Sequence, residues 1–442
     1  MKRKSIIFWV CFFVLFSLNK RVYADPENTD FLELYSESAI LIDADTKQIL
    51  YSKNEHQILY PASITKIMTI LLGLENGNLE DTVTMSHDAV YSIPSDSSHI
   101  ALFENEQISL ADALYAASIA SANDACNGIA EYVSGNMEKF AKLMTTKAKQ
   151  IGALNTNFAN AHGLTDENHY TTAYDMALIM AYAVKVENYI DITSTLHYNV
   201  NPTNIQSEIR YLHNSNKTMD STSKYYVKEA ITSKTGWTPD SQSTQVTYAS
   251  KNGLNLIAVV IKAKSSDLRY EDTKKLFEYG FANYEYFAAG TMQLMVPTVL
   301  LSEELTLEYE DKEMLRVDAT FTDFVIEAGT SDQIRIVYEV PEVIDKEYGT
   351  NSSVGKINLY YGEKLVQSID VLTIQSIVQK SSISSNSTTN KLLMIGFVGT
   401  LLTLIILFIL KNYYLYKLHK KAELKELRYR EIQMRINQRI YY

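Results

Sequence analysis

Apolar residues follow two different periods along the chain, and these periods indicate where strands and helices lie. Apolar and polar residues alternate over 37–51 on either side of a polar turn, which predicts a β-hairpin. From Pro61 to about Val184 they recur at helical spacing, which predicts mainly helices. Strands return over Val227–Lys262, and Asp272–Phe287 has a helical pattern again. We therefore expect an α+β fold, with a helical cluster on an antiparallel sheet whose first and last strands are neighbours.

The pattern changes after about Phe287, where short segments alternate at a period of two. Turn residues such as Ala328-Gly329 and Gly362-Glu363 separate these segments. Short alternating strands at this spacing are typical of a small antiparallel β domain, which we expect over 288–378. The alternating segments are 305–309, 334–338, 357–361 and 369–371.

The N-terminal residues have the pattern of a secretory signal. Three basic residues, Lys2, Arg3 and Lys4, precede an apolar run from Ile6 to Leu18, and small residues end at Ala24. This pattern predicts a signal peptide over 1–24. The alternative is an anchor that is retained, but the run is short for a hydrocarbon core of roughly 30 Å.

The C-terminal residues have the pattern of a membrane anchor. Leu392–Leu410 contains no charged residue, and at roughly 1.5 Å per residue such a helix crosses a bilayer. Basic residues dominate the tail, 411–442, so the positive-inside rule places the tail in the cytoplasm and the body on the cell-wall side. We therefore expect a single-pass cell-membrane protein. A polar linker, 379–391, joins the body to the span.

Charge and cysteine content narrow the function classes. The chain has a net charge of −11, and since residues 1–24 carry +5 and 411–442 carry +6, the remaining body carries −22. A body this acidic argues against nucleic-acid binding. The two cysteines, Cys11 and Cys126, cannot form a disulfide framework, and we expect Cys126 to be a small core residue.

The first candidate for chemistry is Ser63-Ile64-Thr65-Lys66. The pattern Ser-x-x-Lys recurs at 17–20, 221–224 and 353–356, but only at Ser63 does a preceding proline, Pro61, open an amphipathic helix. Ser63 and Lys66 would then lie on one helical face. A serine hydroxyl becomes a good nucleophile when a base takes its proton, and a lysine with a lowered pKa can be that base.

Two further motifs follow in order. Ser121-Ala122-Asn123 lies between two predicted helices, where Asn123 could also be a helix cap. Lys234-Thr235-Gly236 occurs once, on a predicted strand followed by Trp237. A lysine and a hydroxyl can hold a carboxylate, and a glycine lets a ligand approach the strand closely.

The three motifs in this order match the penicillin-recognising serine enzymes. Their long flanks make the match specific, and the chain resembles the secreted D-alanyl-D-alanine carboxypeptidases, the low-molecular-weight penicillin-binding proteins, from about Ser36 to Phe287. The resemblance implies a β-lactamase-like transpeptidase fold. The flanks that carry it are 39–69, 121–135, 158–179 and 268–284.

The resemblance also implies roles for individual residues. Ser63 would be the nucleophile, Lys66 its general base, and Ser121 the group that relays the proton to the departing D-alanine. Asn123 would hold the substrate amide, and Lys234 and Thr235 its terminal carboxylate. The oxyanion hole would consist of the backbone N–H groups of Ser63 and Trp237, and Gly236 and Trp237 would be among the substrate-binding residues. His162 and His169 would shape the site.

The expected partners are peptidoglycan stem peptides ending in D-Ala-D-Ala and β-lactam antibiotics, and no metal or cofactor is implied. The chain departs from the family pattern at Ser233, usually apolar, at Thr145, usually Asn, and at Ser241-Gln242, usually Ala-Gly. The family's glycine is absent at position 242, which bears on the local strand geometry and so on how the substrate fits.

Two other functions fit the same sequence. A DD-endopeptidase or β-lactamase would keep the fold and change the reaction, and Glu167 is the candidate to activate deacylating water in a β-lactamase. A non-catalytic muropeptide-binding sensor would use the pocket for recognition and the basic tail for signalling.

Overall fold

The computed structural model describes residues 32–309, 313–379, 411–413, 417 and 420. The chain divides into two compact units: Met1–Ala288 with Asp323–Ser331, and Ala289–Thr322 with Asp332–Tyr442. The expected signal peptide, the membrane span and all of the linker after Gln379 lie outside the described residues. Within the residues that are described, no helix is long and apolar enough to cross a membrane.

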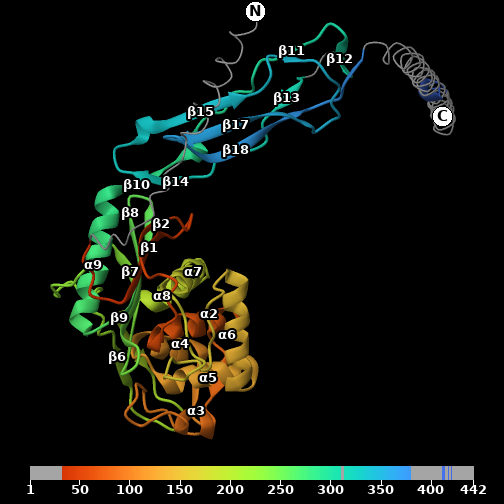
Figure 1. The fold of residues 1–442 in the computed structure, drawn as a ribbon. Coiled ribbons are helices and arrows are strands. Elements are labelled where there is room, and N and C mark those ends of the chain that lie inside the picture. Colours follow the sequence, from red (N-terminus) through yellow and green to blue (C-terminus); the bar gives the residue numbers. More distant parts are fainter. Residues whose placement is uncertain (1–31, 310–312, 380–410, 414–416, 418–419, 421–442) are drawn as a thin grey trace, which may run out of the picture. The chain divides into compact units, whose positions relative to one another are not determined.

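Unit 1 is built on an antiparallel five-stranded sheet in the order β2-β1-β9-β8-β7 (Figure 1). The expected hairpin and the pairing of sequence-distant strands are confirmed, because β1 pairs with both β2 and β9. Alternate residues of β1 face opposite sides of the sheet, so Ile40 and Ile42 enter one core and Ala39 and Leu41 the other. The strands are β1 Ser38–Asp43, β2 Ile49–Lys53, β7 Ala230–Thr238, β8 Gln242–Lys251 and β9 Leu254–Ala263.

A cluster of helices covers the face of the sheet that carries Ile40 and Ile42 (Figure 1). The apolar stripe at Ile67, Ile70 and Leu71 is buried there, which confirms the helix expected from its spacing. These elements are η1 Ala62–Thr65, α2 Lys66–Asn76, α3 His87–Tyr91, α4 Leu110–Ile119, α5 Asn123–Ser134, α6 Met137–Ile151, α7 Ala173–Ala183 and α8 Tyr189–Ser194.

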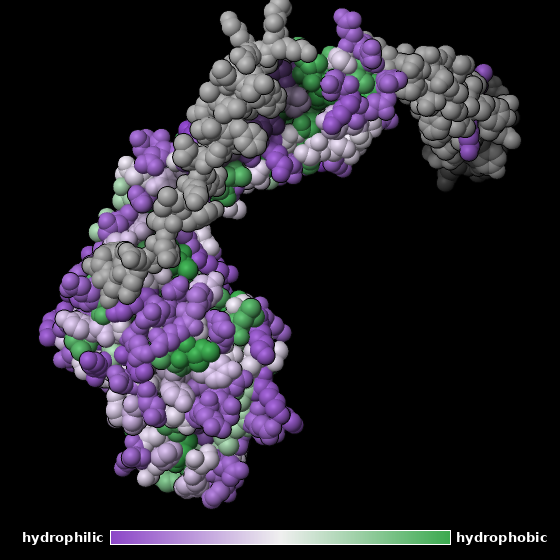
Figure 2. All heavy atoms as spheres, viewed as in Figure 1, coloured by the Kyte–Doolittle hydropathy of each residue, from purple (hydrophilic) through white to green (hydrophobic). Residues whose placement is uncertain are grey.

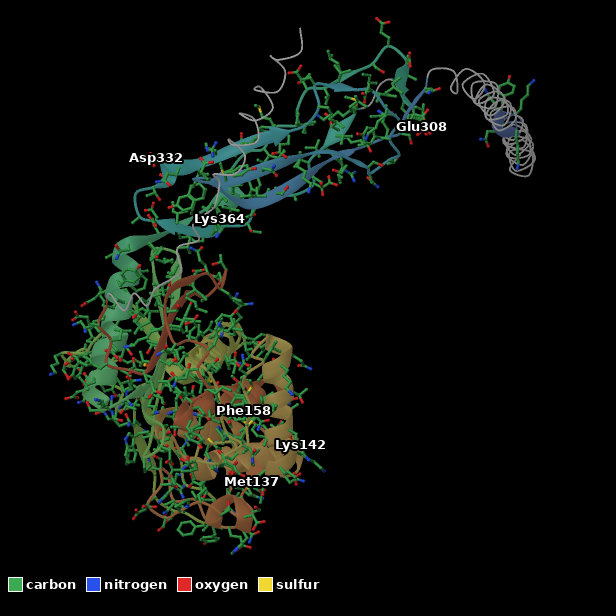
Figure 3. The ribbon with its side chains drawn as sticks, in the orientation of Figure 1. Met137, Lys142, Phe158, Glu308, Asp332 and Lys364 are labelled. Atoms are coloured by element: carbon green, nitrogen blue, oxygen red, sulfur yellow. The ribbon has the colours of Figure 1, made fainter. Side chains whose placement is uncertain are left out.

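Helix α4 begins with a reciprocal capping pair of Ser109 and Asp112. The Ser109 side chain accepts a hydrogen bond from Asp112 N, and the Asp112 carboxylate accepts one from Ser109 N. In Figure 3, α6 carries Met137 and Lys142, and Phe158 lies on the segment that follows it. Unit 1 also contains two small antiparallel pairs of strands: β3 Thr82–Thr84 with β4 Gln107–Ser109, and the hairpin of β5 His197–Val200 with β6 Arg210–His213.

Helix α9, Ser266–Asn283, packs on the opposite face of the sheet, where Leu276 and Phe277 meet Leu41 and Leu256. The expectation of a helix over Asp272–Phe287 is wrong at both ends. Ser265 caps the helix and starts it earlier, and Tyr284–Phe287 forms strand β10, which pairs with β14, Phe324–Glu327.

Unit 2 is β-rich, as its alternating pattern predicts, and contains a four-stranded sheet in the order β13-β18-β17-β15. Asp332 and Lys364 lie on this unit (Figure 3). The expected continuous segment 288–378 is interrupted, because β14 pairs with β10 and so joins Asp323–Ser331 to unit 1. The pairing is not wholly antiparallel either, since β11 and β16 are parallel. The elements are η2 Ala289–Thr291, β11 Leu300–Leu301, β12 Leu305–Leu307, β13 Leu315–Arg316, η3 Ser331–Gln333, β15 Ile334–Glu339, β16 Val343–Ile344, β17 Ser353–Tyr361, β18 Lys364–Thr373 and β19 Ile377–Gln379.

Polar side chains dominate the face of unit 1 seen in Figure 2, where apolar patches are small and separate.

Candidate active site

Ser63 lies in the short η1 turn that leads into α2, and Lys66 is the first residue of α2. The Lys66 side chain has no solvent exposure. Its Nζ lies 2.9 Å from Ser63 Oγ, 2.7 Å from Asn123 Oδ1 and 2.7 Å from the carbonyl oxygen of His162. The expected side-chain contact between Ser63 and Lys66 is therefore present.

The three partners of Lys66 differ in what they can do. Asn123 Oδ1 and the His162 carbonyl only accept hydrogen bonds, whereas the Ser63 hydroxyl can also donate one. A neutral Lys66 amine has two N–H groups and one lone pair. The two acceptors take both N–H groups, so the lone pair is left facing the Ser63 hydroxyl.

Burial of Lys66 increases the fraction of its side chain that is neutral near pH 7. Desolvation lowers the pKa of Lys66 from 10.5 to about 8, and the negative charge of Asp124 acts in the opposite direction but more weakly. Cys126 itself is fully buried on α5, as expected of a core residue, and burial raises the pKa of its thiol to about 11. The thiol is therefore a poor nucleophile.

Ser121 and Ala122 of the second motif lie in the turn between α4 and α5, as predicted, and Asn123 is the first residue of α5. The helix-cap alternative for Asn123 is wrong: Ala122 is the N-cap residue, and the Asn123 side chain accepts its hydrogen bond from Lys66. Ser121 has a left-handed backbone with φ of 56°, which is uncommon for a residue with a Cβ atom. Its Oγ accepts a hydrogen bond of 3.0 Å from Lys234 Nζ.

The third motif lies on β7, the edge strand of the sheet. Lys234 is 7% exposed, and its Nζ donates to Ser121 Oγ and, at 2.9 Å, to the Thr235 carbonyl. Burial first, and then the charge of Lys66, lower the pKa of Lys234 well below its ordinary value. An anion bound beside it would offset both effects and favour the protonated form.

Gly236 is required by a close approach of β7 to the nucleophile. A Cβ atom at this position would lie 2.6 Å from Ser63 N and 2.6 Å from Thr244 Oγ1. Thr244 in turn donates a hydrogen bond to the Pro61 carbonyl, which ties β8 to the segment before Ser63. Trp237, the next residue, is 64% exposed at the rim.

A cavity of about 610 Å³ connects the three motifs. It brings together Ser63, Ser121 and the run from Lys234 to Trp237, whereas Lys66 and Asn123 are buried behind Ser63. Its lining residues are Ser63, Ser98, Ser118, Ile119, Ala120, Ser121, Asn214, Ser215, Asn216, Ser233, Lys234, Thr235, Gly236, Trp237, Ser243, Ser265, Ser266 and Arg269.

Sequence reasoning missed Arg269, which adds a second cation to this cavity. It lies on α9, is 5% exposed, and donates from Nη1 to the Gly236 carbonyl at 3.1 Å. One signal could have found it: Arg269 lies four residues before Thr273 and seven before Leu276, on the buried face of the helix. An arginine at such a position needs polar partners, which suggests a site.

His162 and His169 are buried beside the site and do not line its cavity. His169 accepts a hydrogen bond from Ala159 N at Nδ1, so its Nε2 carries the proton that is shared with Thr65 Oγ1 at 2.8 Å. Burial lowers the pKa of His169 to about 4 and that of His162 well below 6.5. Both rings are therefore neutral at pH 7, in agreement with a shaping role.

Each departure from the family pattern has a local partner. Ser233 Oγ lies 2.6 Å from Thr247 Oγ1 and accepts a hydrogen bond from Gln245, so a small polar network replaces an apolar contact. Thr145 Oγ1 accepts a hydrogen bond from Phe158 N. Ser241 Oγ accepts one from Thr238 N and closes the turn between β7 and β8.

Gln242 keeps the backbone conformation that glycine adopts without strain, with φ of 52°. We expect Gln242→Gly to raise the free energy of unfolding by roughly 0.5–1 kcal/mol, because relief of the left-handed strain exceeds the entropy that glycine adds to the unfolded chain. Thermal unfolding of the full-length chain would measure this. Gln242→Ala is the matched control and should give no gain, because its Cβ atom retains the strain.

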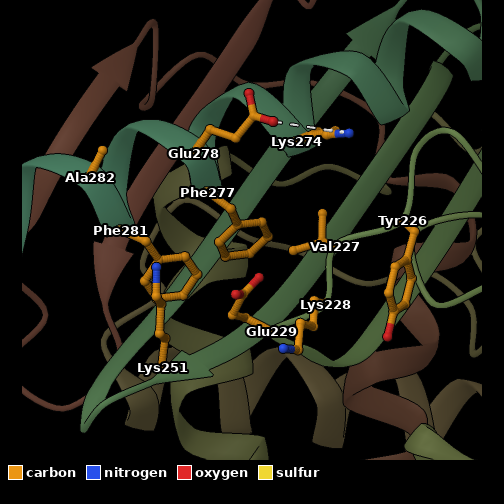
Figure 4. A pocket seen from close by; sticks show the side chains of 10 residues that line it. All are labelled: Tyr226, Val227, Lys228, Glu229, Lys251, Lys274, Phe277, Glu278, Phe281 and Ala282. Carbon is orange, nitrogen blue, oxygen red and sulfur yellow. Dashed lines mark ion pairs between the residues drawn. The ribbon is translucent and has the colours of Figure 1, made fainter. Parts of the chain in front are cut away.

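Glu167, the candidate for water activation in a β-lactamase, is exposed and does not line the cavity. A second cavity, of about 420 Å³, lies between α9 and 226–229 and contains none of the motif residues (Figure 4). Phe277 and Phe281 point into it, and Lys251 lies over the Phe281 ring.

Comparisons with known proteins indicate the same family as the three motifs. The family model of D-alanyl-D-alanine carboxypeptidase, peptidase family S11, matches residues 24–265. D-alanyl-D-alanine carboxypeptidase DacF of Bacillus subtilis is 35% identical over 267 residues, which cover 59% of this chain and 66% of that protein. D-alanyl-D-alanine carboxypeptidase DacA of Haemophilus influenzae is 30% identical over 318 residues, 70% of this chain and 77% of that protein.

A solved structure agrees with these sequence matches. Penicillin-binding protein 5 from Haemophilus influenzae aligns with a TM-score of 0.64 and 27% identity, over 78% of this chain and 98% of that one. The matched region contains all three motifs, and residues of each motif line one cavity. The chain therefore belongs to the D-alanyl-D-alanine carboxypeptidase family, peptidase family S11.

Proposed function

We propose that this protein is a serine-type D-Ala-D-Ala carboxypeptidase that removes the terminal D-alanine from peptidoglycan stem peptides through an acyl-enzyme. The observation that carries the proposal is the buried Lys66 amine, held by Asn123 and His162 so that its lone pair faces the Ser63 hydroxyl. This arrangement is that of a general base beside a nucleophile.

In the first step, Ser63 Oγ attacks the carbonyl carbon of the penultimate D-alanine while Lys66 takes the hydroxyl proton. Negative charge develops on the carbonyl oxygen, and the backbone N–H groups of Ser63 and Trp237 would stabilise it. The absence of a side chain at Gly236 leaves room for this oxygen next to Ser63 N. Loss of one such donor typically lowers the rate roughly 10²–10³-fold.

In the second step, the C–N bond breaks and the amine of the terminal D-alanine leaves with a proton. Ser121 is placed to pass that proton on, since its hydroxyl accepts a hydrogen bond from Lys234 and so has its own O–H free to point elsewhere. Water then hydrolyses the Ser63 ester and frees the shortened peptide. Asn123 would in addition hold the substrate amide.

The terminal carboxylate distinguishes this substrate from an internal peptide. Lys234, Thr235 and Arg269 lie together in the cavity and would bind it. A bound carboxylate offsets the desolvation of the two buried cations, so peptides with a free C-terminus are favoured. A β-lactam carries a carboxylate and a reactive carbonyl in a similar arrangement and would acylate Ser63.

We further propose that the protein acts at the outer face of a cell membrane. The apolar run Leu392–Leu410 and the basic tail after it support an anchor with the catalytic unit on the cell-wall side.

The purified full-length chain, incubated with a D-Ala-D-Ala peptide, should release free D-alanine. Labelled penicillin should form a stable adduct that mass spectrometry locates on the tryptic peptide containing Ser63. Rapid turnover of penicillin without a stable adduct would favour a β-lactamase instead. Cleavage of cross-linked dimers without D-alanine release would favour an endopeptidase.

A further inference from the structure

The hairpin formed by β5 and β6 carries two exposed histidines that face each other. His197 and His213 are directly opposite in the strand register. Their Nδ1 atoms lie 3.2 Å apart, and their ring centroids lie 4.6 Å apart. Because the centroids are farther apart than the nitrogens, the two rings converge at their Nδ1 edges. The two Nδ1 atoms thus lie next to each other on two exposed side chains.

The distance between the two Nδ1 atoms matches the distance between two ligand nitrogens on one zinc ion. Two imidazole nitrogens, each about 2.0–2.1 Å from a tetrahedral Zn²⁺, stand about 3.3 Å apart. Imidazole nitrogen is a preferred ligand of Zn²⁺, and of Cu²⁺ and Ni²⁺, and either ring nitrogen can bind. We propose that His197 and His213 bind one divalent transition-metal ion of the zinc class through their Nδ1 atoms.

Without the metal, one Nδ1–H donates to the other Nδ1. Metal binding needs both Nδ1 lone pairs, so the donating ring moves its proton to Nε2. The change is a shift of tautomer within one ring, and no proton is released from the pair.

The surroundings favour a cation and leave the site open. The pKa of Asp220 is lowered, mainly by hydrogen bonds from Thr222 and in smaller part by His213, so its carboxylate is close enough to interact with charge on that ring. Among the residues that the structure describes, no group of three or more His, Cys, Asp or Glu side chains is placed to hold a metal. Water would therefore complete the coordination, and the ion would exchange readily.

The hairpin links two walls of the active-site cavity. On one side, Tyr198 of β5 stacks on Tyr115 of α4 at 3.9 Å and donates a hydrogen bond to Asp112, and α4 leads to Ser121. On the other side, β6 leads directly to Asn216, which lines the cavity and donates to the Ser233 carbonyl of β7. His197 and His213 lie at the end of the hairpin next to this segment, so a bound ion would clamp the strands where they meet the cavity rim.

The test is calorimetric titration of the EDTA-treated full-length chain with ZnCl₂. We expect one equivalent to bind at the histidine pair. His197→Asn and His213→Asn should each weaken this binding about tenfold or more, because loss of one ligand removes the gain from joining two in one site. His56→Asn is the matched control: His56 is exposed and lies near Glu55, but it has no facing histidine in the described structure, and binding should be unchanged.

Thermal unfolding in EDTA checks that the variants fold, since replacements at exposed positions should unfold at the wild-type temperature. Added Zn²⁺ should raise the unfolding temperature of the wild type and of His56→Asn, but not of the two pair variants. The proposal is overturned if no heat of binding is found up to about 100 µM Zn²⁺, or if both pair variants bind like the wild type.

Discussion

Ser63→Ala should abolish covalent labelling by penicillin and lower D-alanine release by at least roughly 10⁴-fold, because it removes the hydroxyl that faces the Lys66 amine. The cavity also contains Ser121, but that hydroxyl accepts its hydrogen bond from Lys234, whose proton the carboxylate site needs. Its position therefore suits proton relay rather than attack. Labelling by fluorescent penicillin and a D-alanine assay would measure both effects.

The chain offers a matched control for this substitution. Ser221 and Lys224 form a second Ser-x-x-Lys pattern, but both are exposed and neither lines the cavity. Ser221→Ala should therefore leave both readouts at the wild-type level. A Ser63→Ala protein that still forms the penicillin adduct would show that the nucleophile has been assigned to the wrong residue.

Lys66→Ala should lower the rate of acylation by about 10²–10⁴-fold, the typical contribution of a general base. Ser63 would remain but would keep its proton. The substitution also leaves Asn123 Oδ1 and the His162 carbonyl without their donor, which costs stability. Stopped-flow acylation by penicillin would measure the rate, and a melting curve would show the fraction folded. Lys224→Ala is the exposed control, with an unchanged rate expected.

The pH dependence separates loss of a base from loss of structure. The base must be neutral, and the pKa of Lys66 is lowered to about 8 by burial, so acylation by the wild type should rise as the pH increases through about 8. At pH 7 about one Lys66 side chain in ten is then neutral. His162 and His169 lose their protons well below this range and cannot produce the rise. The rise should be absent in Lys66→Ala, and a wild-type rate that is flat between pH 6 and 9 would contradict the assignment.

Contacts between residues close together in the chain could be predicted from the sequence. The pairing of Ser63 with Lys66 follows from helical spacing, and the structure shows the contact at 2.9 Å. The Ser109–Asp112 capping pair follows in the same way. Helix α9 was placed too late, because its first turn, 266–269, contains a single apolar residue, Leu268, and so adds little to the apolar period.

Contacts in the site between residues far apart in the chain could not be predicted from the sequence. The helix-cap interpretation of Asn123 was reasonable for a residue at the start of a helix, yet its side chain is directed to Lys66, 57 positions away. The His162 carbonyl, 96 positions from Lys66, is a backbone atom and has no signature in any pattern of side chains. His197 and His213 become a pair only because β5 and β6 bring them into register.

The amino-acid order alone therefore settles the features that arise within a few residues: the periods of strand and helix, the capping pair, the nucleophile with its neighbouring amine, and through the order of its three motifs the family. Folding of unit 1 adds the properties that need several segments at once. Burial of Lys66 changes its pKa, contact across 113 positions joins Lys234 to Ser121, and the approach of β7 to Ser63 makes a side chain at 236 impossible. Desolvation and steric exclusion depend on everything packed around an atom, so no local pattern contains them.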